Sequence, residues 1–300
     1  MRRRKKICLI AGGGIFGVLP IHFLSMLPEE HQTRFGVDVL GGCSVGALLA
    51  CGIATGAQFS AIDAVFQDRV GECFTKRCIA KINPLACPTY RSDTIYKVLQ
   101  DMMGDMKLKD VASIYPQLKL CCPALDVTAD KYLIFSNMTH EYDDVMLRDV
   151  AAMSSAAPSY FDCVDFNGHA VIDGGLLDVD SCITTVTEVK KHMHIPFIDM
   201  DVLLLGTGFD VDSEPLTVPG YRKLGLLGIA TDILRAYATR GNQLANQSFC
   251  EGLGFHSYTV WNPITVTGDL DEVKLVPKLV QEAEKYKDQF LETWYKWINN

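Results

Sequence analysis

A serine between closely spaced glycines is the first feature of this chain that could do chemistry. Residues 42–46 read GCSVG, the G-x-S-x-G pattern of a nucleophile elbow, with Ser44 at its centre. Such a sharp turn needs small flanking residues, here Gly42 and Gly46, and it exposes the hydroxyl at the positive end of the following helix. The pattern also arises by chance in small-residue turns between a strand and a helix. Ser44 is therefore a candidate nucleophile that still needs a base and an oxyanion site.

A serine hydroxyl is a weak nucleophile without a base, and the best-placed carboxylate for that role is Asp173. It ends the apolar run HAVID and is followed by Gly174 and Gly175, although an Asp-Gly hairpin turn would give the same residues. In the Ser, acid, His order of α/β-hydrolases, a later histidine completes a triad. The histidines after this acid are His192, His194 and His256. None lies at a predicted strand end or glycine turn, and their positions are typical of surface residues.

A glycine-rich segment, GGGIFG at 12–17, has two interpretations. Its glycines Gly12, Gly14 and Gly17 fit the G-x-G-x-x-G loop of dinucleotide-binding enzymes. Asp38 lies near the position of a ribose-binding acid, but further strand residues follow it. The serine elbow also occupies the place where such an acid belongs.

The second interpretation uses the glycine segment and Ser44 together. Adjacent parallel strands would bring the segment beside the serine, where its bare backbone N–H groups could form an oxyanion hole. Glycine suits this role because a side chain would block the acyl carbonyl. Each such donor can stabilise a tetrahedral transition state by roughly 3–4 kcal/mol.

Composition excludes several function classes. The chain has 300 residues, of which 48% are hydrophobic and 21% are charged, as expected for a globular protein with a large core. A net charge of -8 argues against nucleic acid as a partner. The apolar run after the basic residues 2–6 is broken by glycines and Pro20, unlike a signal peptide, and no stretch reaches the roughly 18 apolar residues of a membrane helix. We therefore expect a cytoplasmic protein, with peripheral membrane contact through the basic N-terminus or the C-terminal helix.

The eleven cysteines are odd in number and scattered. A secreted disulfide framework is usually even in number and belongs to a smaller chain. The cysteines also lack the C-x-x-C pairs of a typical zinc site. The sequence therefore favours reduced, mostly buried thiols.

Strands and helices alternate along the chain, which predicts a mainly parallel sheet covered by helices. Predicted strands span 6–11, 37–44, 118–128, 131–137 and 201–208. Predicted helices span 18–27, 45–56, 92–104, 149–157 and about 270–298. The stretch 71–91 is rich in Cys, Pro and Lys and is expected to form a loop or lid.

The motifs GGGIFG, GCSVG and IDGG, in that order, resemble those of the patatin-like phospholipases. The segments at 154–161, 203–208 and 83–99 are similar to further parts of that family, so the resemblance covers about 7–208. It implies one domain over 1–300 with a three-layer α/β/α fold and a mainly parallel central sheet. The motifs lie in its core, and a helical extension spans about 220–300.

The resemblance also implies a Ser–Asp dyad without histidine, in which Asp173 takes the proton from Ser44 and an acyl-enzyme forms. The backbone N–H groups of Gly13, Gly14 and Ile15 would hold the oxyanion. No metal or other cofactor is implied. The expected substrates are (lyso)phospholipids or neutral acyl lipids, and the oligomeric state is left open. The alternatives are a catalytically impaired lipid- or partner-binding relative and a dinucleotide-binding enzyme.

The chain departs from the family pattern at two places. The family often has Asp or Ser before the glycine triplet and a cation before its last glycine, where this chain has Ala11 and Phe16. After the acid, the family often reads Asn-Asn-Pro, and this chain has Asp178, Val179 and Asp180. These changes affect the loops that hold the predicted dyad.

Overall fold

The computed structural model of the chain describes residues 3–33, 35–77, 87–210, 246 and 248–300. At its centre is an eight-stranded sheet in the order β5-β6-β3-β2-β1-β7-β9, with β4 also paired to β3. The strands are β1 (Lys5–Ile10), β2 (Val39–Gly42), β3 (Lys119–Asp126), β4 (Lys131–Ser136), β5 (Val164–Phe166), β6 (His169–Asp173), β7 (Met200–Leu205) and β9 (Ser257–Trp261). A separate pair joins β8 (Phe209–Asp210) to β10 (Thr265–Val266).

The middle of the sheet is parallel, as predicted. Strands β3, β2, β1, β7 and β9 run in parallel, whereas β4 and β6 pair with β3 in the antiparallel sense and β5 does so with β6. The apolar runs of β1 and β7 are buried along almost their whole length, because helices cover both faces of the sheet. The antiparallel part of the sheet carries Asp173, the predicted base, at the end of β6.

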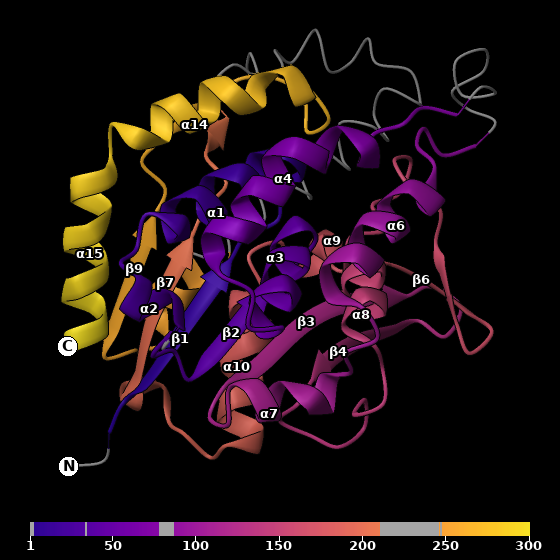
Figure 1. Cartoon of the computed structure of the whole chain (residues 1–300). Helices are drawn as coiled ribbons and strands as arrows, with labels where there is room; N and C mark the ends of the chain where they lie inside the picture. Colours follow the sequence, from indigo (N-terminus) through magenta and orange to yellow (C-terminus); the bar gives the residue numbers. More distant parts are fainter. Residues whose placement is uncertain (1–2, 34, 78–86, 211–245, 247) are drawn as a thin grey trace, which may run out of the picture.

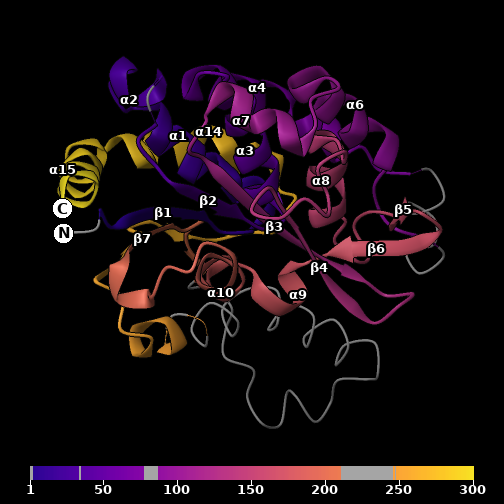
Figure 2. The same cartoon turned by 90° about the horizontal axis from the view of Figure 1, so that it is seen from below.

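Two helical layers enclose the sheet (Figures 1 and 2). The α-helices are α1 (Val18–Ser25), α2 (Glu29–Thr33), α3 (Val45–Ala54), α4 (Phe59–Cys73), α6 (Ser92–Met103), α7 (Val111–Ile114), α8 (Leu147–Ser154), α9 (Gly175–Asp178), α10 (Cys182–His192), α14 (Val276–Glu284) and α15 (Lys287–Asn299). Short 3-10 helices are η1 (Gly14–Gly17), η2 (Leu108–Asp110), η3 (Phe197–Asp199) and η4 (Val273–Leu275). In Figure 2, α9 and α10 lie on one side of the sheet and α1, α3, α4 and α14 on the other. The three-layer α/β/α prediction is confirmed.

Each helical layer has its own apolar core. The larger core joins the sheet to α1, α3, α4, α6, α8, α14 and α15. Helix α3 is buried on all sides, and its residues are all apolar or glycine. The smaller core lies between α10 and the opposite sheet face, around Val186, Val189 and Val202. Within the described part of the chain, no helix is both long and apolar enough to cross a membrane.

The C-terminal helix differs from its prediction. Instead of one helix over about 270–298, the chain forms η4, α14 and α15, with a break at Lys285 and Tyr286. The break lets two separate apolar faces reach the same core. Their buried residues are Val276, Leu279 and Ala283 on α14, and Phe290, Trp294 and Trp297 on α15. A continuous three-to-four-residue spacing did not reveal the change of direction.

Candidate active site

Ser44 stands at the turn between β2 and α3, as the motif predicts. Its backbone angles are φ 55° and ψ -127°, in a region that residues other than glycine rarely adopt. A Cβ atom at Gly42 would lie 2.2 Å from the Gly46 carbonyl oxygen, and one at Gly46 would lie 2.1 Å from the Ile10 carbonyl oxygen. Both elbow glycines are therefore required by close backbone packing.

Sheet register brings Asp173 to the level of Ser44. Gly41 of β2 pairs with Cys121 of β3, and three residues further along β3, Ala124 pairs with Asp173 of β6. Ser44 also lies three residues beyond Gly41. The two residues come together across this part of the sheet, close enough for the Ser44 side chain to lower the pKa of the Asp173 carboxyl group.

The Asp173 carboxyl group is almost completely buried, with 5% of the residue exposed. Burial raises its pKa to about 6, although hydrogen bonds from Ser44, the Gly175 amide and Cys43 lower the pKa and offset part of the burial effect. The Gly175 nitrogen lies 2.7 Å from Asp173 Oδ1, and Cys43 Sγ lies 3.7 Å from the same oxygen. A carboxylate with this pKa is ionised near neutral pH and is a stronger base than an exposed aspartate.

Ser154, at the end of α8, contacts the backbone of Ser44. The Ser44 amide donates to Ser154 Oγ at 3.3 Å, and this hydroxyl donates to the Pro123 carbonyl at 2.6 Å. Gly174 approaches the same carbonyl, since its Cβ would lie 2.6 Å from the Pro123 oxygen. The sequence drew attention to 154–161 only through its resemblance, and gave Ser154 no role.

The glycine segment lies beside the serine. A Cβ on Gly12 would be 3.1 Å from Ser44 Cβ, and one on Gly17 would be 2.4 Å from a methyl of Val45. The Gly12 amide donates to the Val179 carbonyl at 2.7 Å. Gly12 thus ties the segment to the loop that follows Asp173.

Thr207, at the end of β7, anchors the same segment from another strand. Its buried hydroxyl donates to the Gly12 carbonyl at 2.7 Å, and the side chain fills the space that a Cβ on Gly13 would occupy. Thr207 belongs to the LLLGTG stretch of the resemblance, but sequence reasoning did not assign it a contact.

The three predicted oxyanion amides differ in their partners. The Ile15 amide donates to the Leu270 carbonyl at 2.8 Å. No hydrogen bond is recorded for the Gly13 and Gly14 amides within the described part of the chain. Gly14 has φ 57°, and a Cβ there would lie 2.2 Å from the Leu270 oxygen. The C-terminal segment therefore contacts this loop at Gly14 and Ile15.

Asp38 is not placed to act as the ribose-binding acid of a dinucleotide site. Asp38 lies immediately before β2, at the opposite end of the strand from the elbow and the glycine segment. Its carboxylate accepts hydrogen bonds at 2.9 Å from Lys5 Nζ and from the Lys6 amide. Asp38 therefore ties β1 to β2, and its position does not suit a ribose bound at the glycine segment.

The two places that depart from the family pattern are both buried. Phe16 is 5% exposed and packs in the larger core. An apolar side chain therefore occupies the position where the family often has a cation. Asp178 and Asp180 both accept hydrogen bonds from the Asn246 amide, at 2.8 and 3.0 Å. Burial and the nearby Asp178 raise the pKa of Asp180 to about 8, so this carboxyl group holds a proton near neutral pH. Asp178 and Asp180 thus tie the chain segment after Asp173 to Asn246.

Several histidines contact carboxylates elsewhere in the fold. His22 bonds to Asp63 at 2.7 Å, His169 to Asp126 at 2.8 Å, and His192 pairs with Glu188 at 3.2 Å. In the described chain, no hydrogen bond between a histidine and Ser44 or Asp173 is recorded.

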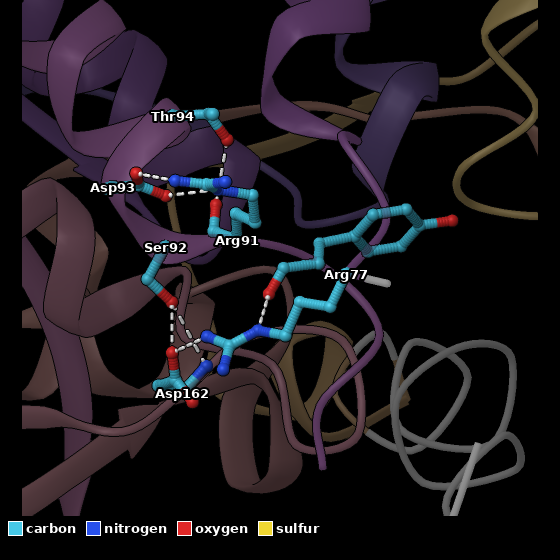
Figure 3. A network of polar contacts seen from close by, with 7 residues as sticks. Arg77, Arg91, Ser92, Asp93, Thr94 and Asp162 are labelled. Atoms are coloured by element: carbon cyan, nitrogen blue, oxygen red, sulfur yellow. Dashed lines mark hydrogen bonds and ion pairs between the residues drawn. The ribbon is translucent and has the colours of Figure 1, made fainter. Parts of the chain in front are cut away.

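A polar network fastens the described part of the expected loop or lid (Figure 3). Arg77 forms an ion pair with Asp162 and donates to the Tyr90 carbonyl at 2.9 Å. Ser92 Oγ donates to Asp162 at 3.0 Å. The backbone of Tyr90 pairs with Tyr160, and this segment runs back to Ala156, whose carbonyl accepts the Asp173 amide at 3.1 Å. Residues 78–86 of the expected lid lie outside the described residues.

Comparisons with known proteins identify relatives of this arrangement. A family model described as "Patatin-like phospholipase" matches residues 9–180. A "cGAMP-activated phospholipase" of Escherichia coli (strain TW11681) is 26% identical over 281 residues, which cover 84% of this chain and 77% of the relative. A protein of the same name from Vibrio cholerae is 25% identical over 261 residues, covering 76% and 71%. "Patatin-like protein 2" of Arabidopsis thaliana is 26% identical over 271 residues, covering 75% and 65%.

Proposed function

Because this chain belongs to the patatin-like phospholipase family, we propose that it hydrolyses acyl ester bonds of lipids through a dyad of Ser44 and Asp173. The observation that carries the proposal is the position of the Ser44 side chain beside the buried Asp173 carboxyl group, whose pKa it lowers. The raised pKa of Asp173 supports its role as the base. The resemblance to the family predicted the same pair.

The proposed reaction has two halves. Asp173 takes the hydroxyl proton as Ser44 Oγ attacks the acyl carbonyl, and the proton passes to the leaving alcohol as the acyl-enzyme forms. A water molecule, deprotonated by Asp173, then attacks the acyl-enzyme, and the fatty acid leaves as Ser44 regains its proton. The buried carboxylate suits both steps, because it accepts a proton and later returns it.

The amides of Gly13 and Gly14 are the proposed donors to the oxyanion. They belong to a loop whose base is fixed by Val179 and Thr207. The Ile15 amide donates to Leu270 in this structure, so it would join the oxyanion hole only after that hydrogen bond breaks. Two donors, at roughly 3 kcal/mol each, would suffice for a large rate enhancement.

The proposed substrates are phospholipids, lysophospholipids or neutral acyl lipids. Two of the relatives are named phospholipases, which favours a glycerophospholipid. The absence of a cation at Phe16 gives no preference for a phosphate-bearing head group. Such substrates reside in membranes, so the proposal includes transient contact with a membrane surface.

A fluorophosphonate probe on the purified full chain tests the nucleophile. Wild-type protein should be labelled, whereas Ser44→Ala should not be and Asp173→Asn should be labelled far more slowly. Ser113→Ala removes an exposed serine of α7 and serves as the matched control. Equal labelling of wild type and Ser44→Ala would exclude Ser44 as the nucleophile.

A panel of phospholipids, lysophospholipids and neutral lipids then tests the reaction. Release of fatty acid that depends on Ser44 supports the hydrolase, and the preferred lipid identifies the substrate class. Lipid binding without release from any class would instead support the impaired, lipid-binding alternative. Saturable binding of a nicotinamide dinucleotide would favour the remaining alternative.

A further inference from the structure

Two cysteines far apart in the sequence meet on the side of the sheet away from the large core. Cys182 begins α10, and Cys250 lies in the middle of the short helical segment 248–252. Both side chains are fully buried, and their sulfur atoms lie 2.7 Å apart. The structure holds both as free thiols.

A second buried pair provides an internal comparison. Cys51 and Cys122 also face each other in the core, with their sulfur atoms 4.0 Å apart, an ordinary contact between two thiols. The sulfur atoms of Cys182 and Cys250 are 1.3 Å closer, which is the difference between 4.0 and 2.7 Å. A disulfide bond is about 2.05 Å long. The Cys182–Cys250 pair therefore needs only a small movement to form a bond, whereas the Cys51–Cys122 pair needs a larger one.

We propose that Cys182 and Cys250 are a site of reversible disulfide formation, with a small peroxide as the oxidant. The first sulfur attacks a peroxide oxygen, so that an S–O bond forms, the O–O bond breaks and one water leaves. The second sulfur then attacks the sulfenic acid, the S–S bond forms, and the hydroxyl departs as a second water. Two thiols are oxidised and one hydrogen peroxide is reduced to two waters.

The bond would fix a contact close to the candidate active site. Asn246 lies one helical turn before Cys250 and donates to both Asp178 and Asp180. Between these acids, the Val179 carbonyl accepts the Gly12 amide. A disulfide at Cys250 would thus hold Asn246 against the loop that anchors the glycine segment.

Peptide mass spectrometry on the full chain tests the bond directly. Cys163 is exposed and shares the tryptic peptide 149–190 with Cys182, so Cys163→Ser is the working background. The reduced protein is treated with hydrogen peroxide while folded, then unfolded and alkylated. We expect two fewer alkylated cysteines and a linked pair of peptides, 149–190 with 241–274, which dithiothreitol separates.

Full alkylation of Cys182 and Cys250 after oxidation would overturn the proposal, as would a bond formed mainly by any other pair. The Cys51–Cys122 pair should stay alkylated in the same sample. Because the contact with Cys250 and burial raise the pKa of Cys182, formation should be faster at higher pH. A rate that is independent of pH would contradict this chemistry.

A stability measurement adds a second readout. The bond would close a long loop, so oxidised protein should unfold at a temperature higher by on the order of 5 °C than reduced protein. Cys250→Ser should abolish the difference between oxidised and reduced samples. Neither readout depends on lipid hydrolysis, so failure of this proposal is distinct from failure of the proposed function.

Discussion

The Ser44 amide and the Ser154 hydroxyl are joined by a hydrogen bond of 3.3 Å, although 110 residues separate them. The Ser154 hydroxyl in turn donates a hydrogen bond to the Pro123 carbonyl of β3. The strained backbone of the elbow is thus held from outside its own strand and helix. This support gives the first prediction.

Ser154→Ala should lower kcat of lipid hydrolysis by about 2- to 10-fold, because one hydrogen bond contributes about 0.5–1.5 kcal/mol. The matched control is Ser155→Ala, since Ser155 Oγ bonds within its own helix to the Ala151 carbonyl at 2.7 Å. Steady-state kinetics on one lipid measures both. Equal activity of the two variants would show that the elbow does not need this support.

The activity should depend on pH through Asp173. Because its pKa is about 6 in the folded protein, kcat/KM should fall as the pH drops below 6, where the carboxylate is protonated and cannot act as a base. A profile of initial rates between pH 4.5 and 8, with folding monitored by circular dichroism, measures this. A rate that stays constant down to about pH 4.5 would argue against Asp173 as the base.

The same carboxyl group should weaken the fold at neutral pH. A folded-state pKa raised from 3.8 to about 6 means that the folded protein favours the neutral form, so stability falls as the pH rises from about 4 to 6. Asp173→Asn should therefore be inactive yet more stable at pH 7, by at most about 2–3 kcal/mol. Denaturant unfolding measures the difference, with exposed Asp68→Asn as the control. A destabilised Asp173→Asn protein would contradict this account.

The elbow glycines should be intolerant of a single added methyl. Gly46→Ala would place a Cβ 2.1 Å from the Ile10 carbonyl oxygen, so the chain must shift, at a cost of about 1–3 kcal/mol or more. Gly252→Ala is the control, because nothing lies within 4 Å of its added Cβ. Thermal unfolding compares them, and similar midpoints would mean that the elbow packs less tightly than described.

Thr207 should act on the rate through the glycine segment. Thr207→Val keeps the shape of the side chain but removes its hydrogen bond to the Gly12 carbonyl, leaving that oxygen buried without this partner. We expect about a 10-fold loss in kcat with little change in KM, and recovery in Thr207→Ser, which keeps the hydroxyl. A loss confined to KM would point to substrate binding instead.

The sequence predicted features that depend on local spacing. The G-x-S-x-G turn, the apolar run that ends at Asp173 and the alternation of strands and helices follow from neighbouring residues, and the fold confirmed the layers that they imply. Ser154 and Thr207 escaped assignment because their partners lie 110 and 195 residues away. Strand β9 was not predicted, and its pairing with β7 likewise depends on the finished sheet.

The hydrogen bond from Ile15 to Leu270 has a consequence for the order in which the molecule is made. Ser44 and Asp173 leave the ribosome long before Leu270, so a growing chain holds both members of the proposed dyad while the glycine segment lacks one of its neighbours. We expect the site to reach its final shape only after the later part of the chain has been synthesised and folded back. In a cell that makes this protein, there would thus be an interval in which Ser44 and Asp173 are both present but the site is not yet complete.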